Sequence, residues 1–177
     1  MKRLLLALAF IFIGAALSAQ DVRECFSVNQ GIIMWRKVFQ ASTDPGSMFK
    51  ALRDKGVFVD LLEEENGVSG RIMPVELDYK GAGYKRMGIA LYVRDQRCSC
   101  YFTVEIREGR YRVTARNLVF TPKYDTGLSK MGEENLVETY AIKGQGFRDV
   151  FFDGPAQSID KTFTDLFTIN NGDDEQW

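Results

Sequence analysis

Apolar and polar residues alternate most regularly between Cys98 and Ile106, where every second residue is apolar. This period of two predicts a β-strand with one buried face. Glu108-Gly109 then predicts a two-residue turn, and the alternation resumes from Arg110 to Arg116. A slip of one residue would mix the two faces, so the register is strongly specified. The predicted apolar pairs are Ile106–Tyr111, Val104–Val113 and Phe102–Ala115, and the predicted polar pairs are Glu105–Arg112, Thr103–Thr114 and Tyr101–Arg116.

The segment before this hairpin predicts one helix among shorter strands. Asp44 can cap a helix, Pro45 suits its first position, and Gly56 suits the conformation that follows a helix end. Asn66-Gly67 predicts a hairpin turn, and Pro74 predicts an edge or an interruption in its strand. Strands are predicted over residues 32–39, 57–62, 68–79 and 89–93.

The last helix is predicted to open at Gly154-Pro155 and to bury one stripe. That stripe contains Ile159, Phe163, Leu166 and Phe167, and the other side contains Asp160, Lys161, Thr164 and Asp165. Residues 136–142 fit either a strand or a short helix. Together the elements predict an α+β fold, with a single antiparallel sheet and two helices packed on one face, in the order β-α-β-β-β-β-α.

The N-terminus has the pattern of a secretory signal peptide. Lys2 and Arg3 precede an apolar run over residues 4–16, which is shorter than the roughly 20 residues of a membrane span. We expect cleavage after Ala19 and an exported protein, periplasmic or extracellular; an uncleaved anchor helix is the alternative. The expected organisation is a signal peptide at 1–19, an N-terminal arm at 20–31, a single α+β domain at 32–169 and a polar C-terminal tail at 170–177.

Composition removes several functional classes. With 45% hydrophobic and 27% charged residues, the chain of 177 residues is typical of a globular domain. Cleavage would remove two of the 23 basic residues and none of the 24 acidic ones, leaving a net charge of −3, which argues against nucleic acid as a partner. The absence of histidine removes the Ser-His-Asp and Cys-His arrangements and histidine metal sites. We therefore expect no enzyme, no cofactor, no metal and no stable membrane insertion after cleavage.

The three cysteines allow two interpretations. Cys98 and Cys100 point to the same face of the predicted strand, about 6–7 Å apart, and are poorly placed to bond each other. A disulfide from Cys25 to one of them is one interpretation, because export permits it. Three small buried thiols are the other, which we favour because free cysteine buries readily.

Several short motifs resemble a known family. They are the strand 35–39 leading into a helix, the Gly70-Arg71-Ile72 strand, and the hairpin 108–112. Over residues 32–120 the chain resembles an uncharacterised domain family of exported Bacteroidota proteins with a TATA-binding-protein-like fold. The resemblance implies the α+β fold and export, and it implies no catalytic residue and no DNA binding.

The best candidate for function is the polar face of the hairpin. Arginine suits carboxylates and phosphates, and tyrosine can stack on a partner. We expect this face to bind an envelope protein with an acidic segment, or an anionic glycan; an ordinary solvated sheet face is the alternative. The candidate residues are Tyr101, Thr103, Arg107, Arg110, Arg112, Thr114 and Arg116, with Arg97 and Lys123 extending the patch.

A second candidate is a carrier of a small apolar ligand. Its cavity would lie between the sheet and the last helix, and plain hydrophobic core is the alternative for the same residues. The lining would be Phe102, Val104, Phe163 and Phe167.

Overall fold

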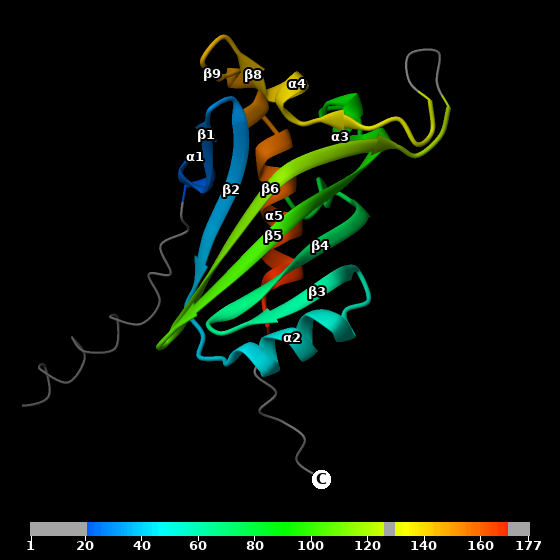
Figure 1. Cartoon of the computed structure of the whole chain (residues 1–177). Helices are drawn as coiled ribbons and strands as arrows, with labels where there is room; N and C mark the ends of the chain where they lie inside the picture. Colours follow the sequence, from blue (N-terminus) through cyan, green and yellow to red (C-terminus); the bar gives the residue numbers. More distant parts are fainter. Residues whose placement is uncertain (1–20, 126–129, 170–177) are drawn as a thin grey trace, which may run out of the picture.

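The computed structural model describes residues 21–125 and 130–169 (Figure 1). An antiparallel seven-stranded sheet runs in the order β1-β2-β6-β5-β4-β3, and β7 pairs with β6. The predicted signal peptide and the tail at 170–177 lie outside the described residues. The strands are β1 Phe26–Asn29, β2 Ile32–Phe39, β3 Phe58–Glu64, β4 Gly67–Glu76, β5 Gln96–Arg107, β6 Arg110–Pro122, β7 Asn135–Leu136, β8 Ile142–Lys143 and β9 Gly146–Phe147. The helices are α1 Val22–Cys25, α2 Pro45–Asp54, α3 Leu91–Asp95, α4 Glu138–Ala141, the 3-10 helix η1 Asp149–Phe152, and α5 Pro155–Phe167.

The hairpin of β5 and β6 has the predicted register. All six predicted pairs are present, from Ile106 opposite Tyr111 to Tyr101 opposite Arg116. The apolar partners Val104 and Val113 are 3% and 0% exposed. Beyond residue 116 the register shifts, and Asn117 adopts a left-handed φ of 52°. The α+β fold with a main antiparallel sheet is thus confirmed, and β8 and β9 form a separate two-stranded sheet that was not predicted.

The core lies between the sheet and α5, which passes behind β5 and β6 in Figure 1. Phe163 meets Trp35 of β2 edge-on at 5.3 Å between ring centroids, and Phe167 meets Phe102 of β5 at 5.1 Å. Each of these side chains is at most 2% exposed. Burying a side chain of this size stabilises the fold by roughly 1.5–3 kcal/mol, so this layer anchors α5 to one face of the sheet.

Helix α2 packs on the same side as α5. The Asp44 carboxylate accepts the Ser47 N–H at 3.0 Å, as the predicted cap requires, and Gly56 has a φ of +68°. After the helix, Lys55 Nζ donates to the carbonyls of Leu166 (2.6 Å) and Thr168 (2.7 Å). These bonds satisfy carbonyls at the end of α5 and tie the two helices together.

Four local expectations need correction or completion. The arm expected at residues 20–31 is wrong for the described part, because residues 22–29 form α1 and β1 with Cys25 and Phe26 buried. The strand expected at 89–93 is wrong, since α3 occupies much of it. Residues 136–142 contain both alternatives, ending β7 and forming α4. The β4 ladder shifts around Pro74, as predicted, because proline lacks the N–H that the ladder needs.

The helical pattern placed Asp160 on the side of α5 away from the apolar stripe, and the expected exposure to solvent is wrong. Asp160 is 8% exposed and accepts the indole N–H of Trp35 at 2.9 Å. Lys37 Nζ donates to both Asp160 carboxylate oxygens (3.0 and 2.9 Å) and to the Thr164 hydroxyl (2.8 Å). A charged pair inside the interface therefore fixes how α5 sits on β2. No helix within residues 21–125 and 130–169 is long and apolar enough to cross a bilayer.

We predict that Asp160→Ala lowers the free energy of unfolding by about 3–5 kcal/mol, because it leaves the Lys37 ammonium and the Trp35 N–H without their buried acceptor. Chemical denaturation followed by circular dichroism measures the loss. Lys161→Ala is the control, since its exposed pair with Asp165 should contribute at most about 1 kcal/mol. Equal effects of the two substitutions would contradict a structural role for Asp160.

Candidate functional site

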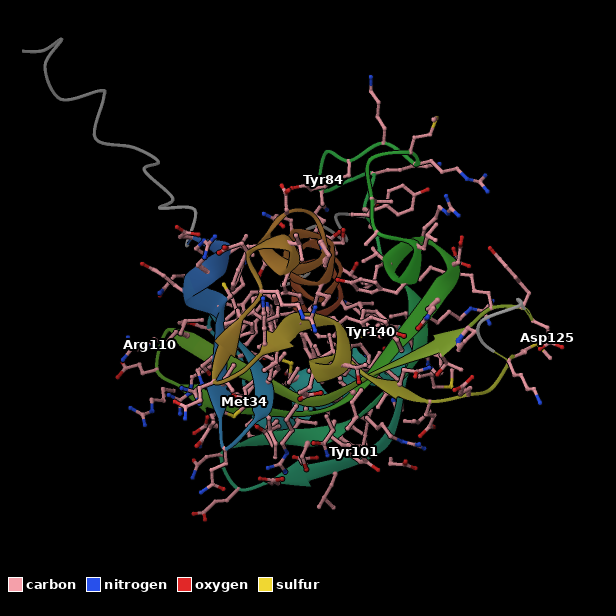
Figure 2. The ribbon with its side chains drawn as sticks, turned by 90° about the horizontal axis from the view of Figure 1, so that it is seen from above. Met34, Tyr84, Tyr101, Arg110, Asp125 and Tyr140 are labelled. Atoms are coloured by element: carbon pink, nitrogen blue, oxygen red, sulfur yellow. The ribbon has the colours of Figure 1, made fainter. Side chains whose placement is uncertain are left out.

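The face of the sheet turned away from α5 remains uncovered by the two long helices, and we call it the open face. Figure 2 shows Tyr101 on this side of the sheet and Arg110 at the tip of the hairpin. The pleat places polar residues here because their neighbours in each strand are buried against α5. Its residues include Ser27, Asn29, Ile32, Met34, Arg36, Val38, Asp60, Leu62, Glu64, Ser69, Arg71, Glu76, Arg97, Ser99, Tyr101, Thr103, Glu105, Arg107, Arg110, Arg112, Thr114, Arg116, Val119 and Thr121.

Strand pairing brings the predicted candidates together in rows. One row runs Met34–Arg116–Tyr101–Arg71 across β2, β6, β5 and β4, and the next runs Arg36–Thr114–Thr103–Ser69. Five of the predicted candidates, Tyr101, Thr103, Arg112, Thr114 and Arg116, are therefore contiguous, and Arg107 and Arg110 continue the face to the hairpin tip.

Two residues suggested as extensions lie apart from this group. Arg97 is on the open face, at the far end of β5. Lys123 follows β6, and its ammonium donates to the Arg94 carbonyl at 2.9 Å and lies 3.2 Å from a Glu76 carboxylate oxygen. Lys123 is therefore held at the far end of the open face, where Glu76 is directly opposite Arg97.

Sequence reasoning missed Arg36 and Arg71. Arg36 lies between the buried Trp35 and the partly buried Lys37, so the alternation in β2 carried a signal for its exposure. The pairing of β2 with β6 was not predicted, and it is this pairing that places Arg36 opposite Thr114. Arg71 joins the face because β4 pairs with β5.

The arginines of the open face fall into two electrostatic groups. Arg112 makes a two-pronged contact with Glu105 (2.9 and 2.8 Å), and Arg71 binds Asp60 (3.0 Å). These exposed pairs contribute little stability. Within the described part of the chain, the guanidinium groups of Arg36 and Arg116 form no hydrogen bond or ion pair, so both remain available to an outside anion.

Two arginines also face each other beside the turn. Arg107 and Arg110 are directly opposite in the register, and neither has an ion-pair partner in the described ranges. Like charges in this position destabilise a strand pair. The hairpin therefore carries an uncompensated electrostatic cost at its tip.

The hollows of the open face are wide open to solvent. One of about 480 Å³ lies at the β3–β4 turn, where Glu64 and Glu65 line it together with Glu105 and Arg107. A hollow of about 230 Å³ lies around Tyr101, Arg71 and Arg116, with Asp60 and Leu62 on its border. It is smaller than the roughly 300–1,000 Å³ of a typical small-molecule pocket. Tyr101 is 52% exposed and supplies an aromatic surface beside the unpaired Arg116. This relief suits a segment lying across the surface better than an enclosed ligand.

The space expected for an apolar ligand is filled with side chains. Val104 is 3% exposed, and the rings of Phe102, Phe163 and Phe167 pack against other rings as described for the core. Packing of this kind is what a domain of this size needs in its core. The four residues proposed as a cavity lining are core residues.

The cysteines are three free, buried thiols, so a disulfide from Cys25 is absent. Burial, with a smaller contribution from the Asp160 carboxylate, raises the pKa of Cys25 to about 12. Burial also raises the pKa of Cys98 to about 12 and that of Cys100 well above its usual value. All three are protonated at neutral pH and therefore poor nucleophiles.

One strongly shifted carboxyl lies outside the open face. Arg94 donates two hydrogen bonds of 2.7 Å to Asp95, and these are the main cause that lowers the Asp95 pKa to about 2, with the Tyr124 hydroxyl helping. The pair joins adjacent residues at the end of α3. Within residues 21–125 and 130–169, no group of three or more acidic or cysteine side chains could hold a metal ion.

Comparison with known proteins gives structural neighbours of low similarity. No protein-family model matches the chain, and no curated protein matches it. The chain is similar to a TBP-like protein from Parabacteroides distasonis (13% identity, TM-score 0.49, covering 81% of this chain and 95% of that one). It is also similar to a DUF4468 family protein from Bacteroides ovatus (13% identity, TM-score 0.47, covering 85% and 94%). Both names agree with the resemblance stated from the sequence.

We predict that Arg110→Thr raises the free energy of unfolding by roughly 0.2–1 kcal/mol, because it removes the like-charge pair and introduces a good strand former. Urea denaturation measures the gain as a higher midpoint concentration, with an unchanged dependence of the unfolding free energy on urea concentration. Arg112→Thr is the matched control on the same strand, and it should bring no gain because Arg112 has Glu105 as its partner. A loss of stability in Arg110→Thr would contradict the assignment of an uncompensated cost.

We predict that a thiol-reactive disulfide reagent labels none of the three cysteines in the native protein and all three in denaturant. The physical reason is that buried, protonated thiols neither meet the reagent nor attack it. The measurement is absorbance of the released chromophore, with a denatured, reduced sample as the control. A count of one thiol in denaturant without reductant would instead indicate a disulfide.

Proposed function

We propose that this protein is an exported, non-enzymatic binding module that holds an acidic protein partner against the open face. The observation that carries the proposal is that the positive charges of this face come from arginine and not from lysine. The described strands contribute to the open face seven arginines, namely Arg36, Arg71, Arg97, Arg107, Arg110, Arg112 and Arg116, and no lysine. Lys123, which follows β6 at the end of the face, is bound to Glu76.

An ordinary solvated face does not need this choice. Lysine serves solubility and blocks edge pairing equally well, and it is common on exposed strands for that reason. Arginine is more weakly hydrated, binds carboxylates through a planar fork, and is enriched in protein interfaces together with tyrosine and methionine, whereas lysine is depleted there. The open face follows the interface pattern, because Met34 and Tyr101 accompany its arginines.

Charge complementarity favours an acidic partner. The seven arginines outnumber the carboxylates of the same face, Asp60, Glu64, Glu76 and Glu105, so the face is positive in a protein whose overall balance is slightly acidic. Such a local field steers an acidic surface toward the face and fixes its orientation. Tyrosine and arginine are also the residues that most often dominate binding energy.

Two other functions have less support. A carrier of an apolar ligand needs a cavity, and the residues suggested for its lining are packed core. An enzyme needs a nucleophile beside a base, and the chain has no histidine while its three thiols are buried and protonated. Export is proposed from the N-terminal pattern of basic and apolar residues.

The proposal predicts that Arg36→Glu/Arg116→Glu abolishes capture of the partner from an envelope fraction, because both unpaired guanidiniums become carboxylates. The captured protein, once identified and purified, should bind the variant at least about 30-fold more weakly by calorimetry. These two positions are better than Arg112, whose reversal would place two glutamates opposite each other.

The matched control is Lys50→Glu/Arg53→Glu on α2, which changes the net charge equally at two exposed positions away from the open face. It should capture the partner as the wild type does. Protease treatment of the fraction should remove the bound material. If capture persists after protease treatment and is lost after oxidation of glycans, the face binds an anionic glycan instead. Undiminished capture by Arg36→Glu/Arg116→Glu would refute the proposal.

A further inference from the structure

We infer that the open face recognises an extended segment with two acidic residues about six positions apart. This inference rests on the proposed function and specifies the partner's chemistry. It follows from two pairs of unpaired arginines and the length of strand between them. The first pair is Arg36 and Arg116, and the second is Arg107 and Arg110.

The first pair lies on adjacent strands. Arg36 of β2 is directly opposite Thr114 of β6, and Arg116 is two residues further along β6 on the same face. Diagonal neighbours of this kind lie about 7–8 Å apart, which long side chains can close around one carboxylate. Thr114 is directly opposite Arg36, and its hydroxyl can donate to the same group. Neither guanidinium has a partner in the described ranges, so the pair is ready for an incoming anion.

The second pair crosses the hairpin beside its turn. Arg107 and Arg110 face each other directly, so their guanidiniums can approach one anion from two sides. A hollow of about 190 Å³ lies beside Arg107 and Arg110. Val38 and Tyr111 also line it, together with Glu105 and Arg112, whose charges are paired with each other. A carboxylate bound there would remove the repulsion between the two arginines. The repulsion that destabilises the free hairpin would therefore favour binding of an anion.

The two pairs have a fixed separation. Arg110 and Arg116 are six residues apart on the continuous strand β6, which corresponds to about 20 Å. An extended chain covers that distance in about six residues, and an α-helix would need about 13. Between the pairs, Glu105 already occupies Arg112, so the central part of the face has no free cation for a third acid. The face therefore selects for acidic ends and a neutral middle.

The experiment uses synthetic peptides of one composition and length, with blocked ends and two glutamates in a neutral serine and threonine background. The glutamates stand at i and i+2, i and i+6, or i and i+10. Binding to the full-length protein is followed by NMR titration at low salt, which measures weak affinities. We expect the i, i+6 peptide to bind about 10-fold more tightly than the others, because a linker that matches the span makes the second contact effectively intramolecular.

Variants separate spacing from charge. Arg36→Ala and Arg110→Ala should each abolish the preference for i, i+6, and Arg53→Ala on α2 should retain it. Arg36→Lys should lose most of the preference, since it keeps the charge and removes the fork. Equal binding of all three peptides, no binding of any peptide, or retention of the preference in Arg110→Ala would overturn this inference. The partner capture described above would still stand in those cases, so the two proposals fail separately.

Discussion

The structure depends on one constraint, which is that α2 and α5 both pack on the same side of the sheet. The alternation along β5 and β6 supplies one apolar face, and Phe163 and Phe167 cover it. The Lys37–Asp160 pair then holds α5 on β2, and Lys55 holds its far end to α2. With the rings of Trp35, Phe102, Phe163 and Phe167 packed in one layer, the opposite side of the same strands is left mainly polar. The candidate site is thus a by-product of how the core is closed.

The parts of the fold that were predictable depend on local chemistry. The hairpin register followed from alternation and a two-residue turn, and α2 followed from Asp44 and Pro45. The burial of Asp160 was not predictable, because its partners Trp35 and Lys37 are more than 120 residues away in the chain. A polar residue in a helix looks exposed until the element that satisfies it is known. The strand β1 was not predicted for the same reason. Its short sequence has no clear strand pattern, and its pairing with β2 provides the hydrogen bonds that make it a strand.

The site divides in a similar way. The residues within the hairpin, such as Arg112 and Thr114, could be placed on one face from the sequence because the turn fixes their neighbours. Arg36 and Arg71 arrive from β2 and β4, whose pairing with the hairpin involves contacts between distant segments. The distinction between paired and unpaired arginines also required coordinates, since it depends on Glu105 and Asp60. Sequence therefore located the face, and only the sheet order revealed its grouping of charges.

The three buried thiols impose an order of events on a protein that leaves the cytoplasm as proposed. In an oxidising compartment an unfolded chain with three cysteines can form mismatched crosslinks, including bonds between molecules. Cys98 and Cys100 lie in β5 at the centre of the sheet, so they escape oxidants only once that strand is paired and covered. The chain must then fold faster than its sulfur is oxidised. After export, correct maturation would therefore depend on rapid pairing and covering of the β5–β6 hairpin.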